Sequence, residues 1–128
     1  MIRIKKVYKP PNRNDGSRFL VERLWPRGVK RSALKMTAWI RDIGPSRELR
    51  VWFNHEPAKW DKFRQRYFAE LDSKRQIWEI IVRAALEGNV TLLYSSHDSE
   101  HNNAVALKEY LATKLRSNKS QETQVHAA

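Results

Sequence analysis

The polar segment that follows residues 90–94 gathers the side chains best suited to chemistry. It supplies hydroxyl, carboxylate, imidazole and amide groups from Ser95, Ser96, Asp98, His101 and Asn102. Histidine exchanges a proton near neutral pH, and hydroxyl and amide groups can orient a ligand. The segment is predicted to bind a ligand, with Asp98 and His101 as candidate catalytic residues. The structural alternative is that Asp98 or Ser99 caps the next helix.

A second cluster, residues 23–28, ends a predicted strand. Arg23 and Arg27 flank Trp25 there. Guanidinium groups bind phosphate or carboxylate through paired N–H donors, and the indole can stack on a flat ligand or on an arginine. The alternative is that Trp25 fills the core while the arginines pair with carboxylates, because a buried arginine needs a partner. The carboxylates considered for that pairing are Glu22, Asp42 and Asp98.

His55 lies in a polar loop and is the third candidate catalytic residue, with a surface or capping role as its alternative. A metal set would join His55 to His97, Asp98 and His101. Imidazole and carboxylate suit zinc or iron, but His97 and His101 straddle a loop and no His-Glu-x-x-His motif is present. We therefore predict no metal site, and the residues indicate no particular cofactor.

The charge of the chain is concentrated in its first half. The net charge of the chain is +11. Residues 1–50 account for +10 of it, because they hold 14 Lys or Arg against 4 Asp or Glu. Such a segment attracts anions, and Arg18 and Arg50 join Arg23 and Arg27 as candidate ligand-binding residues. The chain has no cysteine and only 4 glycines, which excludes thiol nucleophiles, disulfides and a glycine-rich phosphate loop. With no apolar membrane span or signal-peptide pattern, we expect a soluble cytoplasmic protein.

The predicted elements form a small α/β fold. Residues 2–8, 19–25 and 90–94 are rich in β-formers and predict three strands. Apolar spacing predicts helices over residues 32–40, 48–53, 58–71, 73–87 and 103–115. We expect a single domain over residues 1–116, with a short, mostly parallel sheet of about three strands packed by helices. Residues 117–128 are polar and aperiodic and predict a flexible tail.

These motifs, taken together, resemble the YeaO-like proteins, a domain of unknown function. The resemblance rests on Asp15-Gly16-x-Arg18, Val21-Glu22-Arg23-Leu24-Trp25-Pro26-Arg27-Gly28, His55-Glu56-Pro57-x-x-Trp60 and Asp98-x-x-His101-Asn102. It covers about residues 2–112 and implies a compact α/β domain in the cytoplasm, without an established reaction. Glu22 stands where the family usually has Asp, and His97 where Lys is common.

Three classes of function fit these residues. The leading hypothesis is a pocket for phosphate, carboxylate or a nucleotide-like ligand, formed where the second strand ends and the last helix begins, with or without catalysis. It requires Arg23 and His101 to share one hollow. The first alternative is a non-catalytic nucleic-acid-binding module that uses the basic half of the chain. The second is a structural or oligomerising protein with an exposed apolar patch.

Overall fold

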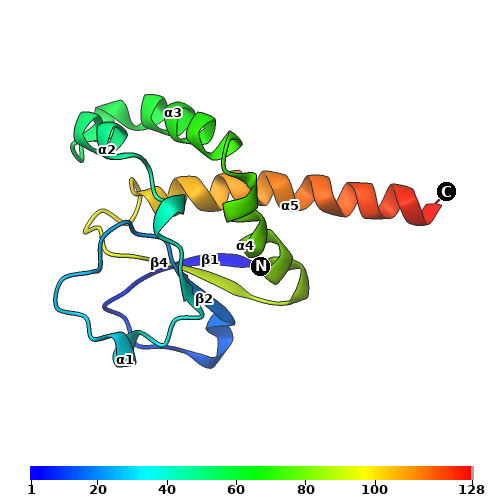
Figure 1. Ribbon diagram of the computed structural model, residues 1–128, viewed down its shortest axis with the longest axis horizontal. Helices are drawn as coiled ribbons and strands as arrows, with labels where there is room; N and C mark the ends of the chain where they lie inside the picture. Colours follow the sequence, from blue (N-terminus) through cyan, green and yellow to red (C-terminus); the bar gives the residue numbers. More distant parts are fainter. Residues whose placement is uncertain (128) are drawn as a thin grey trace.

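The centre of the fold is a parallel sheet of four strands in the order β1-β4-β2-β3 (Figure 1). The computed structural model describes residues 1–127, and side chains through residue 118. The strands are β1 (Ile2–Lys6), β2 (Ser17–Leu20), β3 (Ala38–Trp39) and β4 (Val90–Tyr94). Every pairing is parallel, so the predicted α/β class is confirmed. Because parallel strands share one direction, the carboxyl ends of β2 and β4 lie at the same edge.

The sheet has one strand more than expected, because β3 was predicted to be part of a helix. Helix α1 covers only Arg31–Leu34, and Lys35 after it adopts a left-handed conformation with φ of 50°. That conformation ends a helix. Two residues of β3 then pair with the end of β2. The second strand is also shorter than residues 19–25, because the chain leaves the sheet soon after Leu20 and directs Glu22 and Arg23 elsewhere.

The two faces of the sheet are covered differently. One face carries the main core, in which Phe19 and Leu92 pack with helical residues such as Tyr67, Ile81 and Leu107. The longer helices on this side are α2 (Arg47–Phe53), α3 (Trp60–Asp72), α4 (Arg75–Glu87) and α5 (Asn103–Ala127). The other face holds a small cluster of Val7, Leu20, Leu34 and Leu93 under the loops around α1. The alternation of Leu92 and Leu93 follows the two-residue period of a strand.

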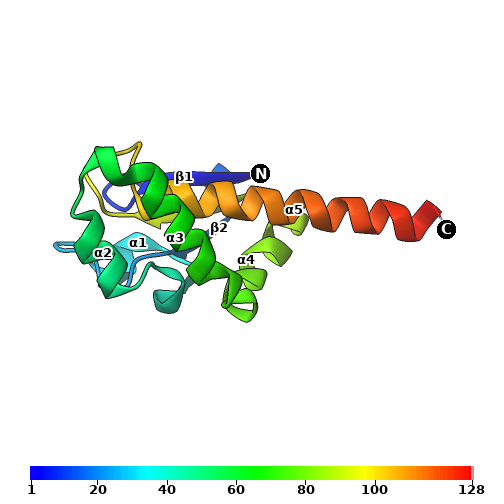
Figure 2. The same ribbon diagram turned by 90° about the horizontal axis from the view of Figure 1, so that it is seen from above.

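Helix α5 extends past the rest of the molecule (Figures 1 and 2). Residues 117–127, for which the sequence predicted a flexible tail, continue this helix. Those residues contain no proline or glycine and several good helix formers, so nothing in them stops the helix. Ala128 lies outside the described residues. Within residues 1–127, no helix combines the length and apolar character needed to span a membrane.

Three short 3-10 helices, Arg13–Asp15, Arg41–Ile43 and Pro57–Lys59, complete the fold. The 3-10 helix Arg41–Ile43 directly follows β3 and leads into α2. A hydrogen bond from Arg23 to the Gly44 carbonyl holds this segment beside the end of β2. In the first view, the loops after β2 and β4 and helix α2 lie at the same end of the molecule (Figure 1). This end is where the candidate site lies.

Candidate functional site

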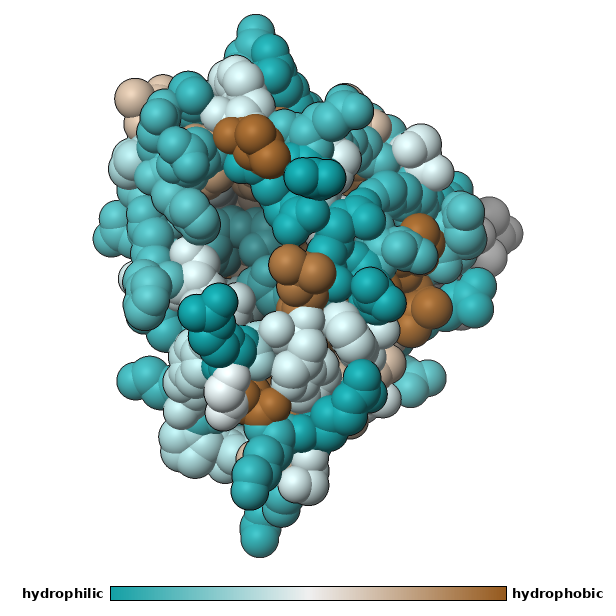
Figure 3. Space-filling model, turned by 60° about the vertical axis from the view of Figure 1, so that its left-hand side comes forward, coloured by the Kyte–Doolittle hydropathy of each residue, from teal (hydrophilic) through white to brown (hydrophobic). Residues whose placement is uncertain are grey.

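A pocket of about 270 Å³ opens at the carboxyl ends of β2 and β4. Its walls are Glu22, Arg23, Pro45, Arg50, Phe53, His55, Phe63, Ser95, Ser96, His101, Asn102 and Asn103. Seen from this end, the surface is hollowed and its surroundings are mostly hydrophilic (Figure 3). Open α/β sheets commonly bind ligands beyond the carboxyl ends of their strands.

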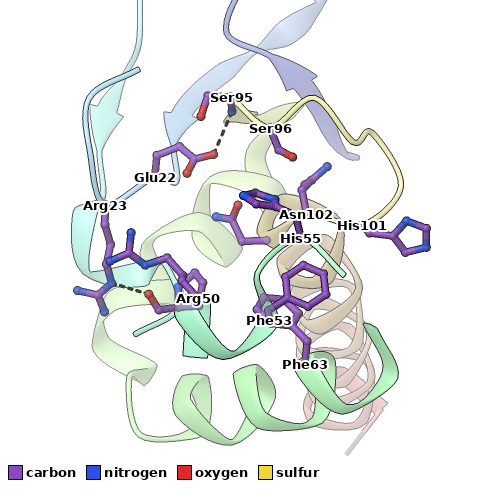
Figure 4. A pocket seen from close by; sticks show the side chains of 12 residues that line it. Glu22, Arg23, Arg50, Phe53, His55, Phe63, Ser95, Ser96, His101 and Asn102 are labelled. Atoms are coloured by element: carbon purple, nitrogen blue, oxygen red, sulfur yellow. Dashed lines mark hydrogen bonds between the residues drawn. The ribbon is translucent and has the colours of Figure 1, made fainter. Parts of the chain in front are cut away.

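The pocket brings together seven of the eleven residues predicted to form a site. They are Arg23, Arg50, His55, Ser95, Ser96, His101 and Asn102, drawn from both ends of the chain (Figure 4). Arg23 and His101, which the leading hypothesis places in one hollow, both line this pocket. The other four residues, Arg18, Trp25, Arg27 and Asp98, do not line the pocket.

Arg18 is a structural residue. It is only 5% exposed and forms an ion pair with Asp15, while its Nη2 donates to the carbonyl of Leu34 at 2.7 Å. Lys5 Nζ also contacts Asp15, at 3.0 Å. Burial opposes ionisation of Asp15, but hydrogen bonds from Asn12, Lys5 and Arg18 outweigh it and lower the pKa of this carboxyl. Nε, Nη1 and Nη2 of Arg18 all donate to partners within the fold, and Arg18 lies outside the pocket.

Trp25 and Arg27 also lie away from the pocket. The Trp25 indole N–H donates to the carbonyl of Val29 at 2.6 Å, and its ring packs edge-on against Trp39 with centroids 5.4 Å apart. Arg31 lies over the Trp25 ring at 4.9 Å. Arg27 is exposed on the loop between β2 and α1. Trp25 therefore fills the small core, as the structural alternative proposed.

Asp98 positions His101. Its Oδ2 lies 3.0 Å from His101 Nδ1, and its Oδ1 accepts the backbone N–H groups of Glu100 and His101. The Glu100 hydrogen bond is the largest cause of the lowered pKa of Asp98, and His101 adds to it. The His101 ring also meets Trp60 edge-on at 5.3 Å. Its imidazole points away from the other labelled side chains, so His101 is at the rim (Figure 4).

The N-terminus of α5 meets the pocket through Asn102 and Asn103. Asn102 Oδ1 accepts the backbone N–H of Val105 at 3.0 Å, and its Nδ2 donates to the carbonyl of Asp98 at 2.8 Å. Asn102, rather than Asp98 or Ser99, is therefore the cap of this helix. Asn103 Nδ2 donates to the carbonyl of Val21 at 2.8 Å and ties the helix to the end of β2. The positive end of the helix dipole consequently lies at the pocket.

Glu22 is a pocket residue that the prediction missed. Its Oε1 accepts the backbone N–H of Ser95 at 3.0 Å. Burial raises the pKa of this carboxyl, and the hydrogen bonds from Ser95 and the charges of Arg50 and His55 oppose that rise only in part. A charged residue inside a mostly apolar predicted strand was the signal that could have identified it, because such a residue is costly there unless it has a role.

The two pocket arginines are not paired with carboxylates. Arg23 Nε donates to the carbonyls of Gly44 and Pro45, at 3.2 and 2.7 Å, and not to the carboxylates of Glu22, Asp42 or Asp98 that the structural alternative named. Arg50 Nε is buried and has no hydrogen-bond partner among the described residues. Neither guanidinium group forms an ion pair with a carboxylate of the described side chains, and the charge of Arg50 opposes the rise in the pKa of Glu22.

His55 is held in the pocket wall by an unusual backbone conformation. Asn54 caps α2 with φ of 47°, and His55 follows with φ of 55°. Two successive left-handed residues without glycine are costly, and such conformations concentrate at functional sites. Among residues whose side chains are described, no three His, Cys, Asp or Glu groups come together to hold a metal ion.

Comparison with known proteins identifies relatives along nearly the whole chain. Residues 1–127 match the family described as "Inactive DUF488-N3 subclade". The chain is 40% identical over 110 residues to the uncharacterized protein YeaO of Escherichia coli K12, covering 86% of this chain and 96% of the relative. It is 37% identical over 79 residues to the uncharacterized protein Rv3073c of Mycobacterium tuberculosis H37Rv, covering 62% and 67%. No solved structure matches the chain. The chain therefore belongs to this DUF488-N3 family of YeaO-like proteins.

Proposed function

We propose that the protein binds a small anionic molecule in the pocket and does not transform it. Arg50 carries the proposal, because its guanidinium lines the pocket without an ion-pair partner among the described side chains, and guanidinium groups bind phosphate or carboxylate oxygens through their terminal N–H donors. Arg23 adds a second positive charge and α5 adds the positive end of its dipole. Glu22 is the one carboxylate in the pocket wall.

The size of the pocket limits the ligand. The pocket has a volume of about 270 Å³. This volume lies just below the range of about 300–1,000 Å³ typical of drug-sized ligands. Phe53, Phe63 and Pro45 supply an apolar wall. A phosphate or carboxylate on a small organic group fits these features.

Binding without turnover agrees with the family description, which calls the subclade inactive. The hydrogen bond of 3.0 Å between Asp98 and His101 favours catalysis by proton transfer as the second candidate function, since such a pair orients an imidazole. His101 is directed away from the pocket, however, which supports binding more than proton transfer (Figure 4).

The two alternatives from the sequence receive less support. Stacking of nucleic acid needs free aromatic faces beside basic groups. Arg31 lies over both Trp25 and Trp39, and Lys59 and Arg66 lie over Trp52. A structural protein needs a wide apolar patch. The exposed large apolar residues of the described chain are Met1, Tyr8, Leu24, Val51 and Ile80, of which only Leu24 and Val51 line a common hollow.

The test is a titration of the full chain with inorganic phosphate, sulfate and small carboxylates, read by thermal shift and calorimetry. A ligand at 100 times its Kd stabilises the fold by about 2.7 kcal/mol, which raises the melting temperature by several degrees. Arg50→Gln should weaken binding about tenfold or more. Arg83→Gln, on an exposed face of α4, removes the same charge and should change nothing. Equal binding by the Arg50 and Arg83 variants would refute the proposal, as would turnover of the bound molecule for its non-catalytic part.

A further inference from the structure

The wall of the pocket is shared with a second hollow. This hollow, of about 350 Å³, is lined by Arg23, Leu24, Arg41, Asp42 and Arg50, and we call it the arginine hollow. Arg23 and Arg50 line the pocket as well. The two spaces are therefore separated by little more than a shared pair of guanidinium groups.

Arg41 is held in place by neutral groups. Its Nε donates to the backbone carbonyl of Arg23 at 3.3 Å, and its guanidinium lies over the Trp39 ring at 5.0 Å. The Arg41 guanidinium thus stacks on the indole face and is anchored through Nε. Its terminal N–H groups lie in the guanidinium plane and can donate to another acceptor. Arg23 is anchored in the same way by the carbonyls of Gly44 and Pro45.

The charge of the arginine hollow is not neutralised. None of its arginines forms an ion pair with a carboxylate of the described side chains, whereas Arg18, Arg64 and Arg83 do. Asp42 is the one acidic residue of the wall and leaves an excess of two positive charges. Lys74 Nζ donates to the Asp42 carbonyl at 2.8 Å, which places a further cation next to the hollow. Pre-positioned, unpaired guanidinium groups bind phosphate oxygens strongly.

We propose that the ligand carries two directly linked anionic groups, as a diphosphate does, with one in the pocket and the other bound by Arg41 in the arginine hollow. This proposal rests on the proposed function and specifies its ligand class. The groups are adjacent because Arg23 and Arg50 face both spaces. Two anions far apart on a long molecule would not share these arginines.

The test is calorimetry of the full chain with inorganic phosphate and with pyrophosphate at one fixed ionic strength. Pyrophosphate should bind at least tenfold more tightly than phosphate. Arg41→Gln should remove that advantage and leave phosphate affinity within twofold, while Arg83→Gln should preserve both affinities. Asp42→Asn should increase pyrophosphate affinity severalfold, which tests the hollow without loss of a stabilising contact.

The outcomes separate the two proposals. If phosphate binds through Arg50 but pyrophosphate gains nothing, or if Arg41→Gln behaves like Arg83→Gln, the second group is refuted and the pocket stands. If the parent chain binds neither phosphate nor pyrophosphate, the proposed function fails together with the inference built on it.

Discussion

Glu22 and Ser95 are 73 positions apart in the chain, and a hydrogen bond of 3.0 Å joins the Glu22 carboxylate to the backbone N–H of Ser95. The contact ties the segment after β2 to the segment after β4. It also sets a carboxylate among the positive groups of the pocket, where it can lower the affinity for an anion and accept an N–H group of the ligand.

We expect Glu22→Gln to strengthen binding of inorganic phosphate severalfold at pH 7. The amide oxygen can still accept the Ser95 N–H, while the negative charge that repels the ligand is removed. Calorimetry of the parent and variant at pH 7 measures the difference. Weaker phosphate binding by the variant would mean that the carboxylate assists the ligand.

The stability of the parent should also fall with rising pH because of Glu22. Its pKa is raised above the ordinary 4.5, chiefly by burial, so the folded state binds the proton more tightly than the unfolded state. Glu22 therefore favours folding least at pH values above its folded pKa. The free energy of unfolding of Glu22→Gln minus that of the parent should therefore be larger at pH 7 than below pH 4.5. Urea unfolding from pH 4 to 8 checks this, and a constant difference would contradict it.

Asp15→Asn should destabilise the fold by about 3 kcal/mol, because it leaves the buried Arg18 without its charged partner. The pKa of Asp15 is lowered from 3.8, so its contribution is present above pH 3.8 and is lost as the pH falls through the folded value. Acid unfolding of the variant should therefore be less steep. Asp61→Asn, in an exposed pair with Arg64, is the control and should cost under about 1 kcal/mol.

Asn102→Ala should cost about 1 kcal/mol or more, because it removes the cap of α5 and the bond to the Asp98 carbonyl. Asn102→Ser keeps a side-chain oxygen for the Val105 N–H and should recover part of the loss. Thermal unfolding of the three proteins gives the ranking. Equal stability of the Ala and Ser variants would show that the cap contributes little.

His55→Gly should stabilise the fold by about 0.5–1 kcal/mol while it weakens anion binding. Glycine adopts the observed φ of 55° without the steric cost that histidine has. His97→Gly is the matched control, since His97 is exposed and outside the left-handed region, and it should be neutral or destabilising. A destabilised His55→Gly would show that contacts of the imidazole outweigh the strain of the backbone.

The sequence predicted the elements whose pattern is repeated over many residues. The helices expected at 58–71 and 73–87 correspond to α3 and α4, and the strand expected at 90–94 is β4. Apolar periodicity identifies such elements because one whole face is buried. The two residues of β3 have no periodicity to detect, and their pairing with β2 depends on where the preceding turn of helix stops.

The sequence predicted which residues meet at this edge of the sheet better than it predicted the contacts that they make there. Polar loops after two parallel strands had to meet at one edge, so Arg23, Ser95 and His101 could be placed together. The roles of Arg18 and Glu22 could not be derived, because that of Arg18 depends on its burial beside Asp15 and that of Glu22 on Ser95, which is distant in sequence. Arg23 finds carbonyl partners that carry no sequence signature.

The central position of β4 has a consequence for synthesis of the chain on the ribosome. Because β1 and β2 pair with β4 and not with each other, the sheet cannot form until residues 90–94 have left the exit tunnel. Up to that point the nascent chain contains the helices through α4, but the central strand of the sheet against which they pack is missing. Truncation before β4 should therefore yield an unfolded, protease-sensitive fragment rather than a smaller stable domain.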